Sequence, residues 1–259
     1  MELSGRIALV TGAGSGLGRG AALALAREGA DLILVSRTEE ELQAVAAEIE
    51  RLDRRADYRA LDVSDDAAMR DLFAWIGREH GRLDAVFANA GINGVWAPID
   101  ELQPDEWDKT IRINLRGTYL TLHFAVPLMK RHGGAVVITS SINGTRTFTT
   151  GGASAYSTTK AGQVALAQML ALELAQYRIR VNVICPGSIE SDIAENTTRR
   201  HVEQAKVPAI YPEGTVPLTK GKPGTAAQVG DLVAFLVSEK AAHISGTPIY
   251  IDGAQSLLV

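Results

Sequence analysis

The amino-acid sequence predicts an α/β fold in which a doubly wound, parallel β-sheet of about seven strands carries helices on both faces. Two observations predict it. Short aliphatic or β-branched runs alternate with longer helix-like segments along the 259 residues, and a glycine-rich turn follows the first apolar run directly. Strands that alternate with helices imply βαβ units, whose right-handed crossovers build a parallel sheet.

Seven apolar runs are candidate strands. They span 7–10, 32–35, 58–63, 83–88, 135–139, 181–184 and 248–251, of which 58–63 is the weakest. Continuous apolar runs of this length are typical of strands that are covered on both faces. The runs therefore favour a sheet buried between two layers of helices.

The segments between these runs carry helical signals. Residues 17–29 are rich in Ala and Leu and end at Gly29, which is a common C-terminal signal. Thr38 followed by Glu41 predicts a capping box at the start of the next helix. Further helices are expected at 65–79, 104–131, 153–176 and 225–238.

The chain shows no internal repeat, no low-complexity linker and no break in composition, so we predict one domain over residues 1–259. The segment 187–224 departs from the alternating pattern, because it has no strand signal, a predicted short helix at 192–205 and four prolines. Long irregular insertions in compact domains are usually binding loops or lids. This one follows the carboxyl end of a strand, where ligands bind, so we expect it to cover the substrate.

Composition narrows the classes of function. Hydrophobic residues make up 46% and charged residues 22% of the chain, as in globular proteins and unlike disordered ones. The formal net charge of -4 argues against nucleic acid or an anionic membrane as the main partner. The single cysteine, Cys185, excludes an internal disulfide and is expected to be an inert packed thiol. Five scattered histidines form no zinc spacing, so no metal is expected.

The sequence also carries no targeting pattern that we recognise. The first ten residues lack the basic start and the long apolar core of a signal peptide. No uncharged apolar stretch approaches the roughly 18 residues that a membrane span needs. We therefore expect a soluble, cytoplasmic chain.

A glycine-rich turn follows the first predicted strand and consists of Thr11-Gly12-Ala13-Gly14-Ser15-Gly16-Leu17-Gly18. Glycines let the backbone turn tightly and approach a pyrophosphate, whose charge is favoured by the N-terminus of the helix that follows. This strand–turn–helix context indicates a dinucleotide site. The turn has no Gly-Lys-Ser/Thr ending, which disfavours a P-loop nucleotide hydrolase.

The spacing T-G-x-x-x-G-x-G resembles that of the short-chain dehydrogenase/reductase family, and other motifs of that family follow in order. They are Asn89-Ala90-Gly91, Ile113-Asn114-Leu115, Ser140-Ser141-Ile142-Asn143-Gly144, Tyr156-Ser157-Thr158-Thr159-Lys160, Pro186-Gly187, Ser245-Gly246 and Asp252-Gly253. The resemblance extends over essentially the whole chain. It implies a Rossmann-type fold and an NAD(P)-dependent oxidoreductase.

Three residues predict the catalytic chemistry. Tyr156 and Lys160 are four residues apart and share one face of a helix. We expect the ammonium of Lys160 to lower the pKa of the phenol, which is near 10 in a free tyrosine, so that Tyr156 can transfer a proton. Ser141 would donate a hydrogen bond to the substrate oxygen, as an oxyanion-hole group does. The family pattern S-x-x-G, which ends at Gly144, selects Ser141 over Ser140.

The resemblance assigns a further role to Asn114, which would hold a water that links Lys160 to solvent as a proton relay. One interval departs from the family pattern. Ser141 and Tyr156 are fifteen positions apart, slightly more than in many members, and the extra residues fall in the polar loop 145–150. This loop should border the substrate, so the catalytic roles carry over from the family while the substrate does not.

The choice of cofactor depends on the end of the second predicted strand. An acidic residue about 20 residues after the glycines would hold the ribose 2′-hydroxyl of NAD, whereas this strand ends in Val35-Ser36-Arg37. An arginine pairs well with the 2′-phosphate of NADP. Because Glu39, Glu40 and Glu41 follow and weaken such a site, NADP(H) is favoured and NAD(H) remains the alternative.

The resemblance implies a full set of cofactor contacts. Asp62 and Val63 would lie at the adenine, and Ile189 would face the nicotinamide carboxamide. The set comprises Gly12, Gly14, Ser15, Gly16, Leu17, Gly18, Ser36, Arg37, Asp62, Val63, Asn89, Ala90, Gly91, Tyr156, Lys160, Pro186, Gly187 and Ile189.

Together these features predict a reversible carbonyl reductase or secondary-alcohol dehydrogenase, and the segments 93–98 and 143–150 favour a small polar substrate. Two alternatives stay open, a cofactor-binding regulatory protein without turnover and an epimerase or dehydratase that uses the same site. By resemblance, the chain forms a homotetramer or homodimer through its Ala/Leu-rich helix at 165–174. The candidates to line the substrate pocket are Trp96, Arg146, His201 and Tyr211.

Overall fold

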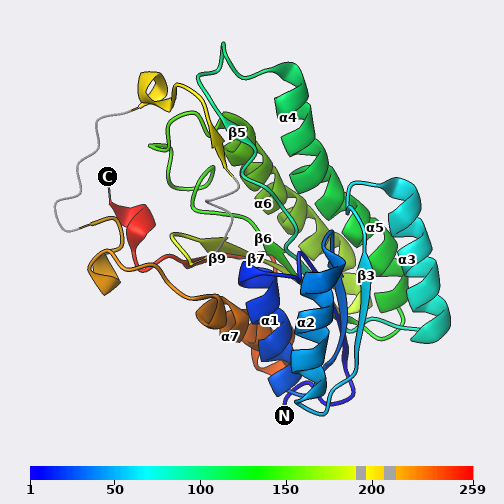
Figure 1. The fold of residues 1–259 in the computed structure, drawn as a ribbon. Helices are drawn as coiled ribbons and strands as arrows, with labels where there is room; N and C mark the ends of the chain where they lie inside the picture. Colours follow the sequence, from blue (N-terminus) through cyan, green and yellow to red (C-terminus); the bar gives the residue numbers. More distant parts are fainter. Residues whose placement is uncertain (191–196, 207–213, 259) are drawn as a thin grey trace.

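The central feature of the computed structural model, which describes residues 1–190, 197–206 and 214–258, is a seven-stranded sheet (Figure 1). Its strand order is β3-β2-β1-β4-β6-β7-β9, and every neighbouring pair is parallel. The strands are β1 Ile7–Thr11, β2 Asp31–Ser36, β3 Ala56–Ala60, β4 Ala85–Ala88, β6 Gly134–Thr139, β7 Ile179–Pro186 and β9 Pro248–Ile251. The predicted Rossmann-type α/β class is confirmed.

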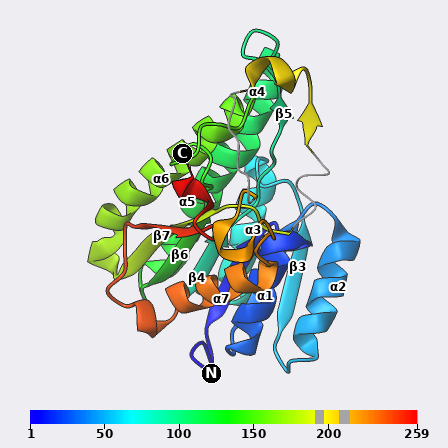
Figure 2. The ribbon, with the colours of Figure 1, turned by 90° about the vertical axis from the view of Figure 1, so that its left-hand side faces the viewer.

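Helices cover both faces of the sheet. The α-helices of the described residues are α1 Gly16–Arg27, α2 Glu39–Glu50, α3 Asp66–Glu79, α4 Pro104–Ile111, α5 Gly117–Met129, α6 Ser154–Leu174 and α7 Ala226–Val237. α1, α2 and α7 pack on one face, while α3, α5 and α6 pack on the other (Figures 1 and 2). Successive strand residues alternate between these layers, so Val10 belongs to the first apolar cluster and Leu9 to the second.

Two predicted elements have different bounds in the structure. β3 ends at Ala60 and not at residue 63, because it pairs with β2 only as far as Ser36, and the chain then turns where Asp62 accepts hydrogen bonds from Ser64. The single helix predicted at 104–131 is divided into α4 and α5 by a π-helical turn, Arg112–Arg116. Such turns widen a helix by one residue and are frequent at functional sites.

The predicted capping box at the start of α2 is wrong. Thr38 precedes the helix, but its side chain makes no capping hydrogen bond. Glu41 packs instead against the glycine-rich turn. A Cβ added at Gly14 would lie only 2.9 Å from the Cβ of Glu41. The side chain that the pattern assigned to the helix end is therefore used in a contact between α2 and the turn.

The segment between β7 and α7 also differs from the prediction. Residues 192–196 of the predicted helix lie outside the described residues, and Thr198–Arg199 form a strand, β8. β8 pairs in parallel with β5 Val95–Trp96 in a separate two-stranded sheet. A helix at this point is therefore wrong for the described residues, apart from the single 3-10 turn Val202–Ala205. The backbone of Thr198–Arg199 is extended because it pairs with β5, whose residues lie about a hundred positions earlier in the sequence, and no local pattern signals this pairing.

Candidate active site

The predicted motifs meet at the carboxyl edge of the sheet. The glycine-rich turn follows β1, Asn89-Ala90-Gly91 follows β4, Ser140-Ser141 follows β6, and Gly187 follows β7. Because all these strands are parallel, their carboxyl ends lie on one side. The fold therefore brings residues from four separate stretches of sequence to one edge.

Hydrogen bonds join the glycine-rich turn to the neighbouring motif. The Thr11 hydroxyl accepts hydrogen bonds from the backbone N–H groups of Asn89 and Ala90 at 3.0 and 3.1 Å, and the Asn89 amide donates to the Thr11 carbonyl at 3.2 Å. A Cβ at Gly18 would collide with the carbonyl of Gly12. The turn is thus held rigidly with bare backbone at the N-terminus of α1, which suits the close approach of a pyrophosphate.

The predicted adenine end carries charged groups. Asp62 accepts two hydrogen bonds of 2.8 Å from the backbone and side chain of Ser64. Desolvation pushes the pKa of Asp62 upward, but these bonds and the nearby guanidinium groups of Arg37 and Arg112 outweigh it and leave the pKa lowered. Val63 is buried, and the Arg37 side chain is exposed beyond β2. Two cations therefore lie close to the carboxylate of Asp62.

Ser141 and Tyr156 lie side by side. Ser141 is buried and accepts a hydrogen bond of 3.1 Å from the Asn143 backbone, while the neighbouring Ser140 hydroxyl donates to the Lys160 carbonyl at 2.7 Å. Burial raises the pKa of Tyr156, and a hydrogen bond with Ser141 opposes that rise. The geometry favours Ser141 as the serine that reaches a substrate, because Ser140 is already used within the protein.

Lys160 lies behind the tyrosine. It is 4% exposed, and its Nζ donates to the Thr139 carbonyl at 2.9 Å and stands 5.4 Å from the centre of the Tyr156 ring. Burial lowers the pKa of Lys160 to about 8. The pKa of Tyr156 is raised rather than lowered, so the net direction expected for this pair is wrong. The desolvation of the phenol dominates, and the ammonium is directed at a backbone carbonyl.

Asn114 occupies the π-helical turn and is fully buried. Its side chain accepts from the Ile92 N–H and donates to the Ile92 carbonyl, both at 2.8 Å, and donates to the Thr159 hydroxyl at 3.1 Å. A Cβ added at Gly91 would lie 3.2 Å from Asn114 Oδ1 and 3.8 Å from Lys160 Nζ. Bare backbone at Gly91 thus leaves the lysine and the asparagine facing a common space.

The loop after β7 is held by the C-terminal segment. Gly187 donates its N–H to the Ile251 carbonyl at 3.1 Å, and the Ser188 N–H donates to Gln255 Oε1 at 2.7 Å. Ile189 forms an isolated bridge with Gly224. Residues 187–189 therefore have a defined path across the edge of the sheet, although the sequence offered no signal for the part played by Gln255.

A family model described as short chain dehydrogenase matches residues 6–201. The chain belongs to the short-chain dehydrogenase/reductase family. It is 37% identical over 257 residues to levodione reductase of Leifsonia aquatica, covering 97% of this chain and 94% of the relative.

Solved structures agree with this assignment. A 3-ketoacyl-ACP reductase from Sinorhizobium meliloti 1021 has a TM-score of 0.94 at 55% identity, with 98% of this chain and 100% of the other covered. A 3-ketoacyl-(acyl-carrier-protein) reductase from Brucella melitensis complexed with NADH has a TM-score of 0.85 at 28% identity. The match covers 98% of this chain and 99% of the other. The family places this chain among oxidoreductases that interconvert carbonyl and alcohol groups with NAD(P).

One aromatic residue beside Tyr156, Trp96, was only weakly indicated by the sequence. The ring of Trp96 lies 6.5 Å from that of Tyr156, centre to centre, and its indole N–H donates to the Asn93 carbonyl at 3.2 Å. β8 brings the Arg199 guanidinium to 5.4 Å from the same indole ring. Arg200 then ties β8 to Glu106 through two hydrogen bonds of 2.6 and 3.0 Å.

The other predicted lining residues are placed differently. Arg146 stacks on the ring of Tyr250 at 3.5 Å, and His201 Nδ1 lies 2.7 Å from a carboxylate oxygen of Glu101. Both side chains have partners within the protein and are largely exposed. Tyr211 lies outside the described residues. Among the described members of this predicted group, Trp96 is thus the one that the structure brings next to Tyr156.

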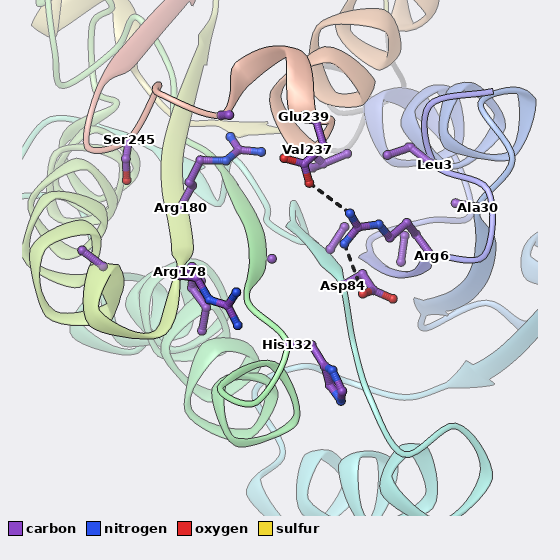
Figure 3. A pocket seen from close by; sticks show the side chains of 16 residues that line it. Leu3, Arg6, Ala30, Asp84, His132, Arg178, Arg180, Val237, Glu239 and Ser245 are labelled. Carbon is purple, nitrogen blue, oxygen red and sulfur yellow. Dashed lines mark hydrogen bonds and ion pairs between the residues drawn. The ribbon is translucent and has the colours of Figure 1, made fainter.

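A cavity of about 560 Å³ lies at the opposite, amino edge of the sheet (Figure 3). Arg6 bridges Asp84 and Glu239 there at 3.5 and 3.0 Å, and Arg180 donates to the Ser238 carbonyl at 2.9 Å. These bonds join the strand starts to the end of α7. None of the predicted site residues lines this cavity, so it is separate from the predicted site at the carboxyl edge.

Three further expectations concern a metal site, a membrane span and the thiol of Cys185. Among the described residues, no group of three or more His, Cys, Asp or Glu side chains could hold a metal ion. Within the same residues, no helix is long and apolar enough to cross a membrane. Cys185 is fully buried, and burial raises the pKa of its thiol to about 11, which agrees with an inert packed residue.

Proposed function

We propose that this chain catalyses the reversible, NADP(H)-dependent reduction of a small polar carbonyl compound to an alcohol, with Asn114, Ser141, Tyr156 and Lys160 as its catalytic residues. The observation that carries the proposal is the adjacent pair of hydroxyl groups on Ser141 and Tyr156, with Lys160 buried behind them. A bound nicotinamide would supply the hydride. The residues fit such a cofactor, because the edge of the sheet presents bare backbone at Gly18 and Gly91.

In the reducing direction, Tyr156 gives its proton to the substrate oxygen while Ser141 donates a hydrogen bond to that oxygen. Burial raises the pKa of Tyr156, so the phenol enters this step protonated, and the phenolate that it leaves has to be stabilised by its surroundings. The ammonium of Lys160 stabilises the phenolate that remains. Asn114, next to Lys160 across Gly91, holds the water through which the proton is replaced.

Replacing Tyr156 by Phe tests the assignment. The ring and its packing against Trp96 remain, but the proton donor is lost, and such donors typically contribute 10²- to 10⁴-fold to the rate. We expect turnover of a ketone panel to fall by about this factor, with binding of the reduced nicotinamide unchanged in a fluorescence titration. Ser141→Ala should behave similarly, whereas Ser140→Ala should leave the rate within about threefold of wild type, because Ser140 is bonded to a backbone carbonyl. A Tyr156→Phe variant with near-wild-type turnover contradicts the proposal.

The preference for NADP(H) rests on Arg37. No acidic residue ends β2, and the exposed guanidinium of Arg37 lies close enough to act on the pKa of Asp62. Charge-assisted bonds to a phosphate contribute about 1.5–3 kcal/mol, so Arg37→Ala should raise the KM for NADPH by roughly 10- to 100-fold and leave that for NADH unchanged. Arg51→Ala, at an exposed position after α2, is the matched control. If wild type prefers NADH and Arg37→Ala changes neither KM, the preference is refuted and NAD(H) is the cofactor.

The remaining proposals concern organisation. We propose that residues 1–259 form one domain, with 187–224 covering the substrate, and that the chain assembles as a homotetramer or homodimer through α6. The support is the exposed apolar side chains of Met169 and Leu172 on that helix, at 71% and 83%. A reduced, buried Cys185 suits a cytoplasmic location. Light scattering of wild type and of Met169→Lys/Leu172→Lys would test the assembly.

A further inference from the structure

The main-chain carbonyl of Asn114 is held by two side chains. The Thr118 hydroxyl donates to it at 2.7 Å, and Gln163 Nε2 donates to it at 3.0 Å. Gln163 Nε2 also donates to Thr118 Oγ1 at 2.8 Å, so the three residues form a closed triangle of hydrogen bonds. Gln163 lies on α6 and Thr118 on α5, and the triangle therefore links the two helices at the π-helical turn.

The orientation of the Gln163 amide follows from its partner. A carbonyl oxygen can only accept, so the amide nitrogen must face Asn114. Gln163 is 1% exposed, and its Oε1 is buried with no hydrogen-bond partner among the described residues. An unpaired buried acceptor destabilises a fold by about 1–3 kcal/mol, which an apolar side chain of the same length would avoid.

The triangle is connected to the catalytic residues through Asn114. The Asn114 side chain donates to Thr159 Oγ1, and the Thr159 hydroxyl donates to the Tyr156 carbonyl at 2.7 Å. On its other side, Asn114 Oδ1 and Lys160 Nζ both border the position of Gly91. A displacement of the Asn114 backbone would thus reach the turn of α6 that carries Tyr156 and Lys160.

We propose that Gln163 is a positioning residue of the active site, which with Thr118 holds the main chain of Asn114 in the π-helical turn and so sets the placement of Tyr156 and Lys160. The inference rests on the proposed function for its kinetic consequence. Its structural content, the coupling of Gln163 to Lys160 through Asn114, does not depend on turnover.

Gln163→Met is the first test, because Met keeps the length of the side chain and removes the amide. We expect kcat to fall about tenfold, from the loss of two neutral hydrogen bonds, with both KM values within about threefold of wild type. The melting temperature should stay unchanged or rise, since the unpaired acceptor is also removed. A purely structural role for Gln163 predicts instead that kcat and the melting temperature fall together.

The chain offers a matched control. The Thr121 hydroxyl donates to the Gly117 carbonyl at 2.8 Å, which is the same type of bond that Thr118 makes one turn earlier on the same helix. Thr118→Val should lower kcat by about threefold to tenfold, because one bond to Asn114 is lost. Thr121→Val should leave kcat unchanged, because the Thr121 hydroxyl donates to the carbonyl of Gly117 and not to that of Asn114.

Gln163→Glu adds a pH readout. A protonated carboxyl can donate to the Asn114 carbonyl, whereas the ionised form repels it, and burial raises the pKa of such a carboxyl. The kcat of this variant should approach the wild-type value at low pH and fall as the carboxyl ionises. The wild-type profile should lack that ionisation.

An NMR titration of the Lys160 ammonium separates the two hypotheses. If the wild type turns over no carbonyl or alcohol, the proposed function fails, but a Lys160 pKa that moves in Gln163→Met and not in Thr121→Val still supports positioning. If the wild type is active and Gln163→Met keeps both the wild-type kcat and the wild-type Lys160 pKa, the positioning role is overturned. The positioning role is also overturned if Gln163→Met and Thr121→Val lose activity and stability to the same extent.

Discussion

Replacing Lys160 by Met should make the cofactor-free protein more stable while it abolishes turnover. Burial lowers the pKa of Lys160 from 10.5 to about 8, so at neutral pH the folded state carries an ammonium that it solvates poorly. At about 1.36 kcal/mol for each pH unit, the difference corresponds to roughly 3 kcal/mol of destabilisation. Met keeps the length of the side chain and removes the charge.

The stability gained by removing the buried charge is partly offset by the loss of a hydrogen bond. Lys160 Nζ donates to the Thr139 carbonyl at 2.9 Å, and the loss of that bond costs about 1.5–3 kcal/mol. We therefore expect Lys160→Met to raise the free energy of unfolding by up to about 1.5 kcal/mol at pH 7. In a chain of this size, that corresponds to a rise of up to roughly 6 °C in melting temperature.

The pH dependence gives the sharper measurement. The folded-state pKa lies below the unfolded value, so between pH 8 and 10.5 the unfolded wild type binds more protons and its stability rises with pH. The variant lacks this group, so its advantage over wild type should be constant below about pH 8, shrink as the pH rises further, and reverse before about pH 10.5. Urea denaturation of both proteins across this range measures the difference, with the exposed Lys109→Met as control. A variant that is less stable than wild type at pH 7, or a difference that does not change with pH, refutes the reasoning.

Two other predictions follow from buried contacts. Gly18→Ala places a Cβ against the carbonyl of Gly12, so it should abolish binding of NADPH in a fluorescence titration. The control is Gly81→Ala, at an open position with positive φ, which should lower the melting temperature without affecting NADPH binding. Cys185, with a thiol pKa of about 11 and no exposure, should resist iodoacetamide at pH 8 in the native protein and react in urea; rapid native alkylation, measured by mass spectrometry, contradicts its burial.

The sequence predicted those parts of the molecule that depend on local patterns. Six of the seven strands of the main sheet contain a short apolar run, so their positions follow from composition, whereas β3, Ala56–Ala60, carries Asp57 and Arg59 and was predicted with other bounds. The motifs at the strand ends meet because parallel strands share a carboxyl edge. The same reasoning misplaced β8, because Thr198 and Arg199 are extended only through pairing with Val95 and Trp96, about a hundred residues away. It also missed the π-helical turn, whose hydrogen bonds to α6 involve side chains that no helical period reveals.

The error about Tyr156 has a different origin. The spacing of Tyr156 and Lys160 correctly indicates two side chains on one helical face, but it carries no information on burial. In the structure, desolvation raises the pKa of Tyr156 and lowers that of Lys160, which is the signature of two groups whose charged forms are both disfavoured. Sequence spacing therefore placed Tyr156 and Lys160 on one helical face but gave the wrong direction for the pKa of Tyr156.

The strand order explains why chemistry was easier to predict than specificity. The chain runs outward from β1 to β2 and β3 and returns to β4 on the other side of β1, so the connections after β1 and β4 diverge to opposite faces. The Thr11 hydroxyl bridges the two strands at this point through its bonds to Asn89 and Ala90. A dinucleotide site is thus fixed by strand ends. The residues around Trp96 and Arg199 belong to no strand of this sheet, and their placement depends on contacts such as Arg200 with Glu106. The loops around Trp96 can therefore change in sequence without disturbing the strand ends that carry the family motifs.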